Sequence, residues 1–126
     1  MFKLIMMNKT IILVVDDSVI SRQILKHQLN NNGFKVDLVS DGLSALAIME
    51  TEKFSFVLMD IVMQGIDGIE TTKLIREKNI DTKIIGIGGS EEDRLASLEA
   101  GMDDYLTKPV CIDSLLKIID NSNGGN

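Results

Sequence analysis

Two adjacent acids, Asp16 and Asp17, directly follow an unbroken aliphatic run, and a third acid, Asp60, ends another apolar run. A buried carboxylate is costly unless a cation or a proton compensates its charge, and neighbouring carboxylates repel one another. Oxygen ligands with no His or Cys nearby suit a hard cation, and Mg²⁺ accepts a few carboxylates while keeping several waters. The three acids therefore predict a Mg²⁺ site if the fold brings them together.

A lysine, Lys108, extends this prediction from metal binding to phosphoryl chemistry. A cation held by carboxylates can also neutralise phosphoryl oxygens, and Lys108 could add a point charge to the same group. One carboxylate of such a site can act as a nucleophile. Asp60 suits this role because it stands alone at its strand end, whereas Asp16 and Asp17 are better placed to hold metal. Solvated acids at strand ends are the simpler alternative.

Five apolar, β-rich segments must position these residues, and they alternate with segments of helical periodicity. The predicted strands cover residues 11–15, 35–39, 54–59, 83–87 and 105–106, and the predicted helices cover about 18–32, 41–50, 69–78, 90–100 and 112–120. This alternation predicts an α/β domain with a parallel sheet and right-handed crossovers. Ligands of such sheets lie outside the carboxyl ends of the strands, so all the candidate residues are expected at one rim.

Local signals mark several helix ends. Ser18 and Asp41 are predicted N-caps, and Ser90 with Asp93 resembles a capping box. The sequence NNNG predicts that the first helix stops at Gly33. Four apolar residues of that helix are expected to share one side: Ile20, Ile24, Leu25 and Leu29.

The bulk composition favours one globular domain. Of the 126 residues, 44% are hydrophobic and 25% are charged, with a formal net charge of −6. We expect a single domain over residues 1–126, with a core from about 10 to 121, an N-terminal extension 1–9 and a tail 122–126. Direct nucleic-acid binding is not expected, because it requires a cationic surface.

The same sequence gives no sign of export or membrane insertion. Its apolar runs are too short to span a bilayer, and the opening MFKLIMM lacks the cleavage site of a signal peptide. We therefore expect a cytoplasmic location. The single cysteine, Cys111, has no partner for an internal disulfide or a CxxC motif, and a buried or neutral thiol is the expectation.

Three motifs carry a family resemblance: VVDDS, LMDIVMQGIDGIE and AGMDDYLTKPV. In this order and at these separations, they resemble the receiver domain of two-component response regulators, from about Thr10 to Asn121. The segment GMDDYLTKP is similar to receivers of hybrid sensor kinases or phosphorelays. The resemblance implies a flavodoxin-like five-stranded sheet of order 2-1-3-4-5 with helices on both faces.

The resemblance also implies roles for particular residues. Asp60 would accept a phosphoryl group from a phosphohistidine on a partner kinase or phosphotransfer protein. Asp17 and Asp60 would ligate Mg²⁺ directly, Asp16 would act largely through water, and the Val62 carbonyl would complete the protein ligands. Lys108 would contact the phosphoryl group. By the same matching, the bond between Lys108 and Pro109 would be cis, and Tyr105 would be the aromatic that swings inward when the site is occupied.

Two positions depart from the family pattern. Gln64 stands where the family usually has Pro, so the loop there should be freer. Gly88 falls where the family has a Thr or Ser that binds the phosphoryl group, and counting back from Lys108 places Gly86 there instead, so the loop after the fourth strand is expected to be about two residues short.

These departures leave phosphorylation of Asp60 in place but predict a weaker or rerouted coupling to Tyr105. Ser90 could substitute for the missing hydroxyl, and Gly88 and Gly89 could offer backbone N–H groups.

Several functions remain open at this stage. The alternative to a phosphoacceptor module is a degenerate receiver that binds a partner without phosphate control, which Gly88 favours. An aspartyl-phosphate hydrolase should carry DxD at its first strand end, and a flavin carrier needs a hydroxyl-rich phosphate loop there. The chain reads Asp16, Asp17 and Ser18 instead. We expect a regulatory domain rather than an enzyme, acting alone or within a longer protein, with a homodimer through the last helices left open.

Overall fold

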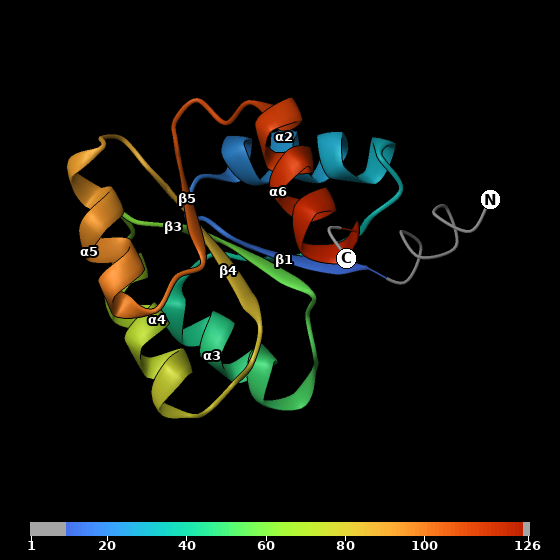
Figure 1. Cartoon of the computed structure of the whole chain (residues 1–126). Helices are drawn as coiled ribbons and strands as arrows, with labels where there is room; N and C mark the ends of the chain where they lie inside the picture. The colour runs from blue at the N-terminus through green and yellow to red at the C-terminus, as the bar shows by residue number, and fades with distance from the viewer. Residues whose placement is uncertain (1–9, 125–126) are drawn as a thin grey trace.

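The computed structural model describes residues 10–124, and the expectation for an extension at 1–9 lies outside this range. Strands and helices alternate throughout (Figure 1). The strands are β1 (Ile11–Val15), β2 (Lys35–Val39), β3 (Phe56–Asp60), β4 (Lys83–Gly88) and β5 (Asp104–Thr107). The helices are α2 (Val19–Asn31), α3 (Gly42–Thr51), α4 (Gly68–Glu77), α5 (Glu92–Ala100) and α6 (Ile112–Gly124).

The five strands form one parallel sheet in the order β2-β1-β3-β4-β5. This is the flavodoxin-like order, so the predicted fold class is confirmed. β1 and β3 are neighbours, with Val15 paired to Met59, and β3 and β4 are neighbours, with Asp60 paired to Ile87. The carboxyl ends of the strands therefore meet at one rim of the sheet.

Helices cover both faces of the sheet (Figure 1). α2 and α6 lie on one face, where Leu29 and Leu115 pack against strand residues such as Val14. α3, α4 and α5 lie on the other face, where Met49 and Ile75 join a second apolar cluster. Strands buried on both sides explain the unbroken aliphatic runs seen in the sequence.

Several predicted boundaries shift along the chain, among them those of β4, which ends at Gly88, and β5, which covers Asp104–Thr107. β3 was expected at residues 54–59 but runs Phe56–Asp60, so Asp60 belongs to the strand rather than following it. Phe54 stays buried, and its carbonyl accepts a hydrogen bond from Thr82 Oγ1 at 2.8 Å instead of joining the sheet. α6 continues to Gly124, so the tail predicted from residue 122 begins as helix.

Most predicted helix ends are confirmed, and one is wrong. Ser18 and Asp41 cap α2 and α3 by accepting backbone hydrogen bonds at 3.3 and 2.7 Å, and Gly33 follows α2 with φ +90°, a conformation that glycine favours. The capping box of Ser90 and Asp93 is absent, since Glu91 precedes α5 and no side chain caps that helix. The Ser90 carbonyl accepts both the Asp93 N–H, at 3.3 Å, and the hydroxyl of the distant Tyr105.

Burial corrects two further expectations. Leu25 and Leu29 of α2 point into the core as predicted, whereas Ile20 and Ile24 are 73% and 52% exposed. Cys111 is exposed rather than buried, and hydrogen bonding from the Ser114 backbone lowers the pKa of its thiol. Within residues 10–124, no helix is both long and apolar enough to cross a bilayer.

Candidate functional site

Three carboxylates meet at the carboxyl rim of the sheet. Asp16 and Asp17 follow β1, Asp60 ends β3, and one ligand oxygen from each lies within 4.8 Å of the others. Asp16 and Asp60 are buried, at 4% and 3% exposure, while Asp17 is open to solvent. The fold thus gathers acids that are far apart in sequence into one anionic cluster.

Backbone groups hold this cluster in place. The Asp16 N–H donates to the Val39 carbonyl at 3.2 Å, and the Asp16 carboxylate accepts the Ser18 N–H at 2.8 Å. Asp17 Oδ2 accepts the Gln64 N–H at 3.2 Å. The position that departs from the family pattern therefore uses the backbone donor that a proline would lack.

Lys108 reaches the cluster from the loop after β5. Its Nζ lies 2.9 Å from Asp60 Oδ1, and its backbone N–H donates to the Gly88 carbonyl at 2.7 Å. The contact with Asp60 is an ion pair between a buried carboxylate and a partly exposed ammonium group. The bond from Lys108 to Pro109 is cis.

The electrostatic balance at Asp60 is unfavourable. Burial raises the pKa of this carboxyl above its ordinary value, the nearby Lys108 opposes that rise, and the negative Asp16 adds to it. The cluster thus holds more negative charge than one half-exposed lysine compensates.

This excess charge fits a divalent cation. The donors are carboxylate oxygens, and no His or Cys belongs to the cluster among the described residues. The residues present therefore suit Mg²⁺.

The remaining predicted site residues lie around this cluster in different ways. Gly88 ends β4 one residue beyond the partner of Asp60, and Gly89 faces open space. The Ser90 side chain is exposed. The backbone carbonyl of Ser90 accepts a hydrogen bond from the hydroxyl of Tyr105, which is 1% exposed. The side chain of Val62 is 74% exposed in the loop after β3.

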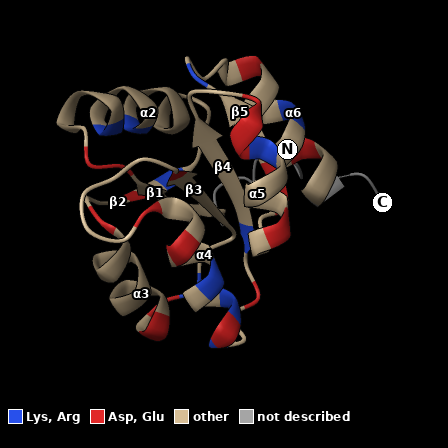
Figure 2. Cartoon of the chain, turned by 90° about the vertical axis from the view of Figure 1, so that its left-hand side faces the viewer, with Lys and Arg blue, Asp and Glu red and all other residues tan. Residues whose placement is uncertain are grey.

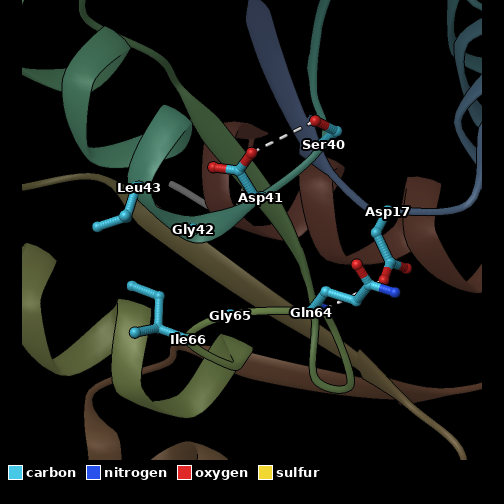
Figure 3. A pocket seen from close by; sticks show the side chains of 8 residues that line it. All are labelled: Asp17, Ser40, Asp41, Gly42, Leu43, Gln64, Gly65 and Ile66. Atoms are coloured by element: carbon cyan, nitrogen blue, oxygen red, sulfur yellow. Dashed lines mark hydrogen bonds between the residues drawn. The ribbon is translucent and has the colours of Figure 1, made fainter.

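A groove adjoins the acids between the start of α3 and the loop after β3 (Figure 3). It encloses about 480 Å³, and Asp17 and Gln64 lie close together at one end. Leu43 and Ile66 line the other end, and Asp41 lies between, near Ser40. The groove widens the approach to the cluster from the α3 side.

Acidic segments gather in the loops at this rim (Figure 2). The backbone of the acidic cluster is also held by a basic residue that the sequence analysis missed. Arg22 Nη1 donates a hydrogen bond to the Asp16 carbonyl at 2.7 Å. A positive charge near the start of a helix opposes the helix dipole. An arginine in the first turn of α2 is therefore unfavourable for the helix itself, and this was the signal that could have identified Arg22.

Comparison with known proteins identifies the family. The family model for the response regulator receiver domain matches residues 12–120. The chain belongs to this family.

Curated relatives share this domain within longer proteins. The transcription factor SKN7 of Saccharomyces cerevisiae is 38% identical over 110 residues, covering 86% of this chain and 18% of SKN7. The response regulator MprA of a Mycobacterium species (strain KMS) is 37% identical over 107 residues, covering 83% of this chain and 46% of MprA. The chain thus spans less than half the length of either relative.

Solved structures confirm the architecture. The receiver domain of the Francisella response regulator 1452 has a TM-score of 0.83 at 33% identity, covering 89% of this chain and 94% of that one. The receiver domain of the Pseudomonas aeruginosa sensor histidine kinase PA1611, with magnesium in its active-site cleft, has a TM-score of 0.82 at 31% identity, with 89% and 95% covered. The receiver of Saccharomyces cerevisiae Ssk1, solved with the phosphotransfer protein Ypd1, scores 0.83 at 29% identity, with 90% and 88% covered.

Proposed function

We propose that this receiver domain is a phosphoacceptor that takes a phosphoryl group from a phosphohistidine onto Asp60. The observation that carries the proposal is the buried Asp60 carboxylate, 2.9 Å from Lys108 and grouped with two further acids. The sequence-based roles of these residues are consistent with this geometry. The domain acts by changing its own covalent state rather than by turning over a separate substrate.

The chain's own groups supply most of the required chemistry. A carboxylate oxygen of Asp60 attacks phosphorus, the bond from phosphorus to the histidine nitrogen breaks, and an acyl phosphate forms. Lys108 lies where it can neutralise a phosphoryl oxygen and guide the group to Asp60. The burial of Asp60 restricts water around the nucleophile.

The proposed cation is Mg²⁺. Asp17 and Asp60 would bind it directly, Asp16 would act largely through water, and the Val62 carbonyl would add an oxygen. When bound, the ion supplies positive charge that offsets the repulsion among the carboxylates and the phosphoryl oxygens. The magnesium described in the PA1611 receiver supports this choice.

Further phosphoryl contacts are proposed at the last residue of β4 and in the loop after it. The backbone N–H groups of Gly88 and Gly89 are candidate donors, and no atom lies within 4 Å of a Cβ built on Gly89. The Ser90 hydroxyl is a third candidate on an exposed side chain.

The proposed partner is a histidine kinase or a histidine phosphotransfer protein. Val19, Ile20 and Ile24 are exposed on α2, which follows Asp16 and Asp17, and Val62 is exposed in the loop that follows Asp60. Exposed apolar side chains next to a reactive site favour protein docking. The complex of Ssk1 with Ypd1 supports this class of partner.

The broader setting is also a proposal. We infer a cytoplasmic module that comprises residues 1–126 as one receiver, in a two-component or phosphorelay pathway, with no direct contact to nucleic acid. Leu95 and Leu98 are exposed on α5, which favours a homodimer through this side of the molecule as a further proposal.

One observation favours a second candidate function. A Cβ on Gly88 would lie 2.3 Å from the Tyr105 hydroxyl, so the position of a hydroxyl-bearing Thr or Ser is filled by the aromatic side chain. A degenerate receiver that binds its partner without phosphate control is the corresponding alternative.

Intact mass spectrometry after incubation with acetyl phosphate separates the two candidates. We expect the mass of one phosphoryl group to be added in the presence of Mg²⁺, and little addition with EDTA. Asp60→Asn should abolish the addition, whereas Asp81→Asn, the same change at an exposed acid, should not. Equal labelling of the wild-type and Asp60→Asn proteins would refute Asp60 as acceptor, and no labelling at all would favour the degenerate receiver.

A further inference from the structure

Tyr105 lies in a trough formed by two glycines of β4. Tyr105 pairs with Gly86 in the sheet, and Gly88 lies on the same face two residues further along. A Cβ on Gly86 would come within 3.2 Å of Tyr105 Cδ1, and a Cβ on Gly88 would come within 3.1 Å of Cε1 and 2.3 Å of the hydroxyl oxygen. The hydroxyl end of the ring therefore occupies space that exists only because Gly88 lacks a side chain, and a Cβ on Gly86 would crowd the ring at its other end.

The hydroxyl end of Tyr105 is also held. Tyr105 donates a hydrogen bond to the Ser90 carbonyl, which ties β5 to the loop before α5. The Arg94 guanidinium lies 5.2 Å from the ring centroid and pairs with Glu91 at 2.9 Å. Glu91 in turn accepts the Thr107 hydroxyl at 2.7 Å. Side chains of α5 and β5 thus close over a ring that is 1% exposed.

We propose that Gly88 locks Tyr105 in this inward position, so that the ring does not change place with the state of Asp60. If the ring moved outward, it would leave a void beside two glycines that have no side chain to fill it, and buried voids are costly. The ring would also give up its hydrogen bond and its contact with Arg94. In this chain the surface made by α5 and β5 therefore keeps one form, and Gly88 acts as the positioning residue.

The packing of Tyr105 against Gly88 can be tested without any phosphorylation. The claim that the ring does not respond to the state of Asp60 rests on the proposed function. The two parts therefore need separate measurements. Tyr105 is the single tyrosine of the chain, which has no tryptophan, so tyrosine fluorescence reports on this one side chain.

The first measurement compares glycine variants by acrylamide quenching of tyrosine fluorescence. Gly88→Ala places a Cβ against the Tyr105 hydroxyl, so the ring must leave its trough and quenching should rise severalfold. Gly89→Ala is the matched control, because no atom lies within 4 Å of its added Cβ. Equal quenching in the two folded variants would overturn the lock.

A double-mutant cycle covers the case in which Gly88→Ala unfolds the protein. Combined with Tyr105→Phe, which removes the hydroxyl 2.3 Å from the new Cβ, Gly88→Ala should cost clearly less stability than it does in the wild type. Additive effects of the two changes on the denaturation midpoint would contradict the proposal.

The second measurement adds beryllofluoride and Mg²⁺ to the wild-type protein. The ¹⁹F NMR signal of bound fluoride reports occupancy of the Asp60 site, and the quenching of Tyr105 should then stay unchanged. A changed quenching at full occupancy would overturn the independence of Tyr105 from Asp60. Absence of a bound ¹⁹F signal would instead count against the proposed function, and the glycine variants would still decide the lock.

Discussion

At the scale of single residues, Asp60 meets two opposing requirements. Its carboxylate is 3% exposed, which suits a protected reaction, yet burial disfavours the ionised form that a nucleophile needs. Lys108 offsets part of this cost at 2.9 Å, while Asp16 increases it. The residue proposed to carry the function therefore weakens the fold when no cation accompanies it.

This cost can be measured with Asp60→Asn. At neutral pH in EDTA, the amide removes the buried negative charge while keeping the shape, so we expect the free energy of unfolding to rise by about 0.5–2 kcal/mol. Denaturant unfolding followed by circular dichroism measures this difference. Asp81→Asn removes an equal charge at an exposed position and should change little. A less stable Asp60→Asn protein would show that burial does not penalise this carboxylate.

At the scale of elements, local side-chain contacts explain where most helices begin. Asp41 accepts the Ser44 N–H at 2.7 Å at the start of α3, and this backbone hydrogen bond lowers the pKa of the Asp41 carboxyl. Asp67 accepts the Glu70 N–H at 2.8 Å at the start of α4 in the same way. α5 lacks such a cap and is held instead by contacts to β5.

The cap of α3 should make stability depend on pH. Because the folded-state pKa of Asp41 lies below its unfolded value, its contribution is complete above the unfolded pKa and disappears as pH falls through the folded pKa. Asp41→Ala should cost about 1 kcal/mol at neutral pH. Asp41→Asn should cost less, and its difference from the wild type should vanish in acid.

Urea unfolding of the three proteins at neutral and acidic pH tests this expectation. A difference between the wild type and Asp41→Asn that persists unchanged in acid would exclude a charge-dependent cap.

Elements were predictable from the sequence where their signals are local. The aliphatic runs of β1 and β4 marked buried strands, and Ser18 and Asp41 marked helix starts. The cap predicted at Ser90 was wrong because α5 begins two residues later, at Glu92, with Glu91 before it and no side-chain cap. The exposure of Ile20 was also missed, since helical periodicity does not show how much of a helix its neighbours cover.

At the scale of the whole molecule, the site links strands that are far apart in sequence. The rule for parallel sheets was enough to place Asp17, Asp60 and Lys108 at one rim, because it depends only on strand order and direction. The trough under Tyr105 could not be foreseen, since its shape comes from the register between β4 and β5.

Mg²⁺ is expected to stabilise the whole domain, because the ion would bind the assembled acids and not the unfolded chain. At a free concentration about 100 times Kd, the gain should be about 2.7 kcal/mol. Thermal unfolding with MgCl₂, against NaCl of equal ionic strength, measures this gain. Asp17→Asn should reduce it strongly, and an equal gain in this variant would place the ion elsewhere.

The order of the sheet has one more consequence, which concerns self-association. β2 and β5 form its two borders, where unpaired backbone groups can recruit strands from other molecules. β5 has only four residues, and β2 carries Lys35 and Asp37 among its five. A short edge strand and a charged edge strand both disfavour pairing with strands of other molecules, and so disfavour aggregation. The chain can therefore expose apolar side chains on its helices while its edge strands remain unsuited to pairing with further strands.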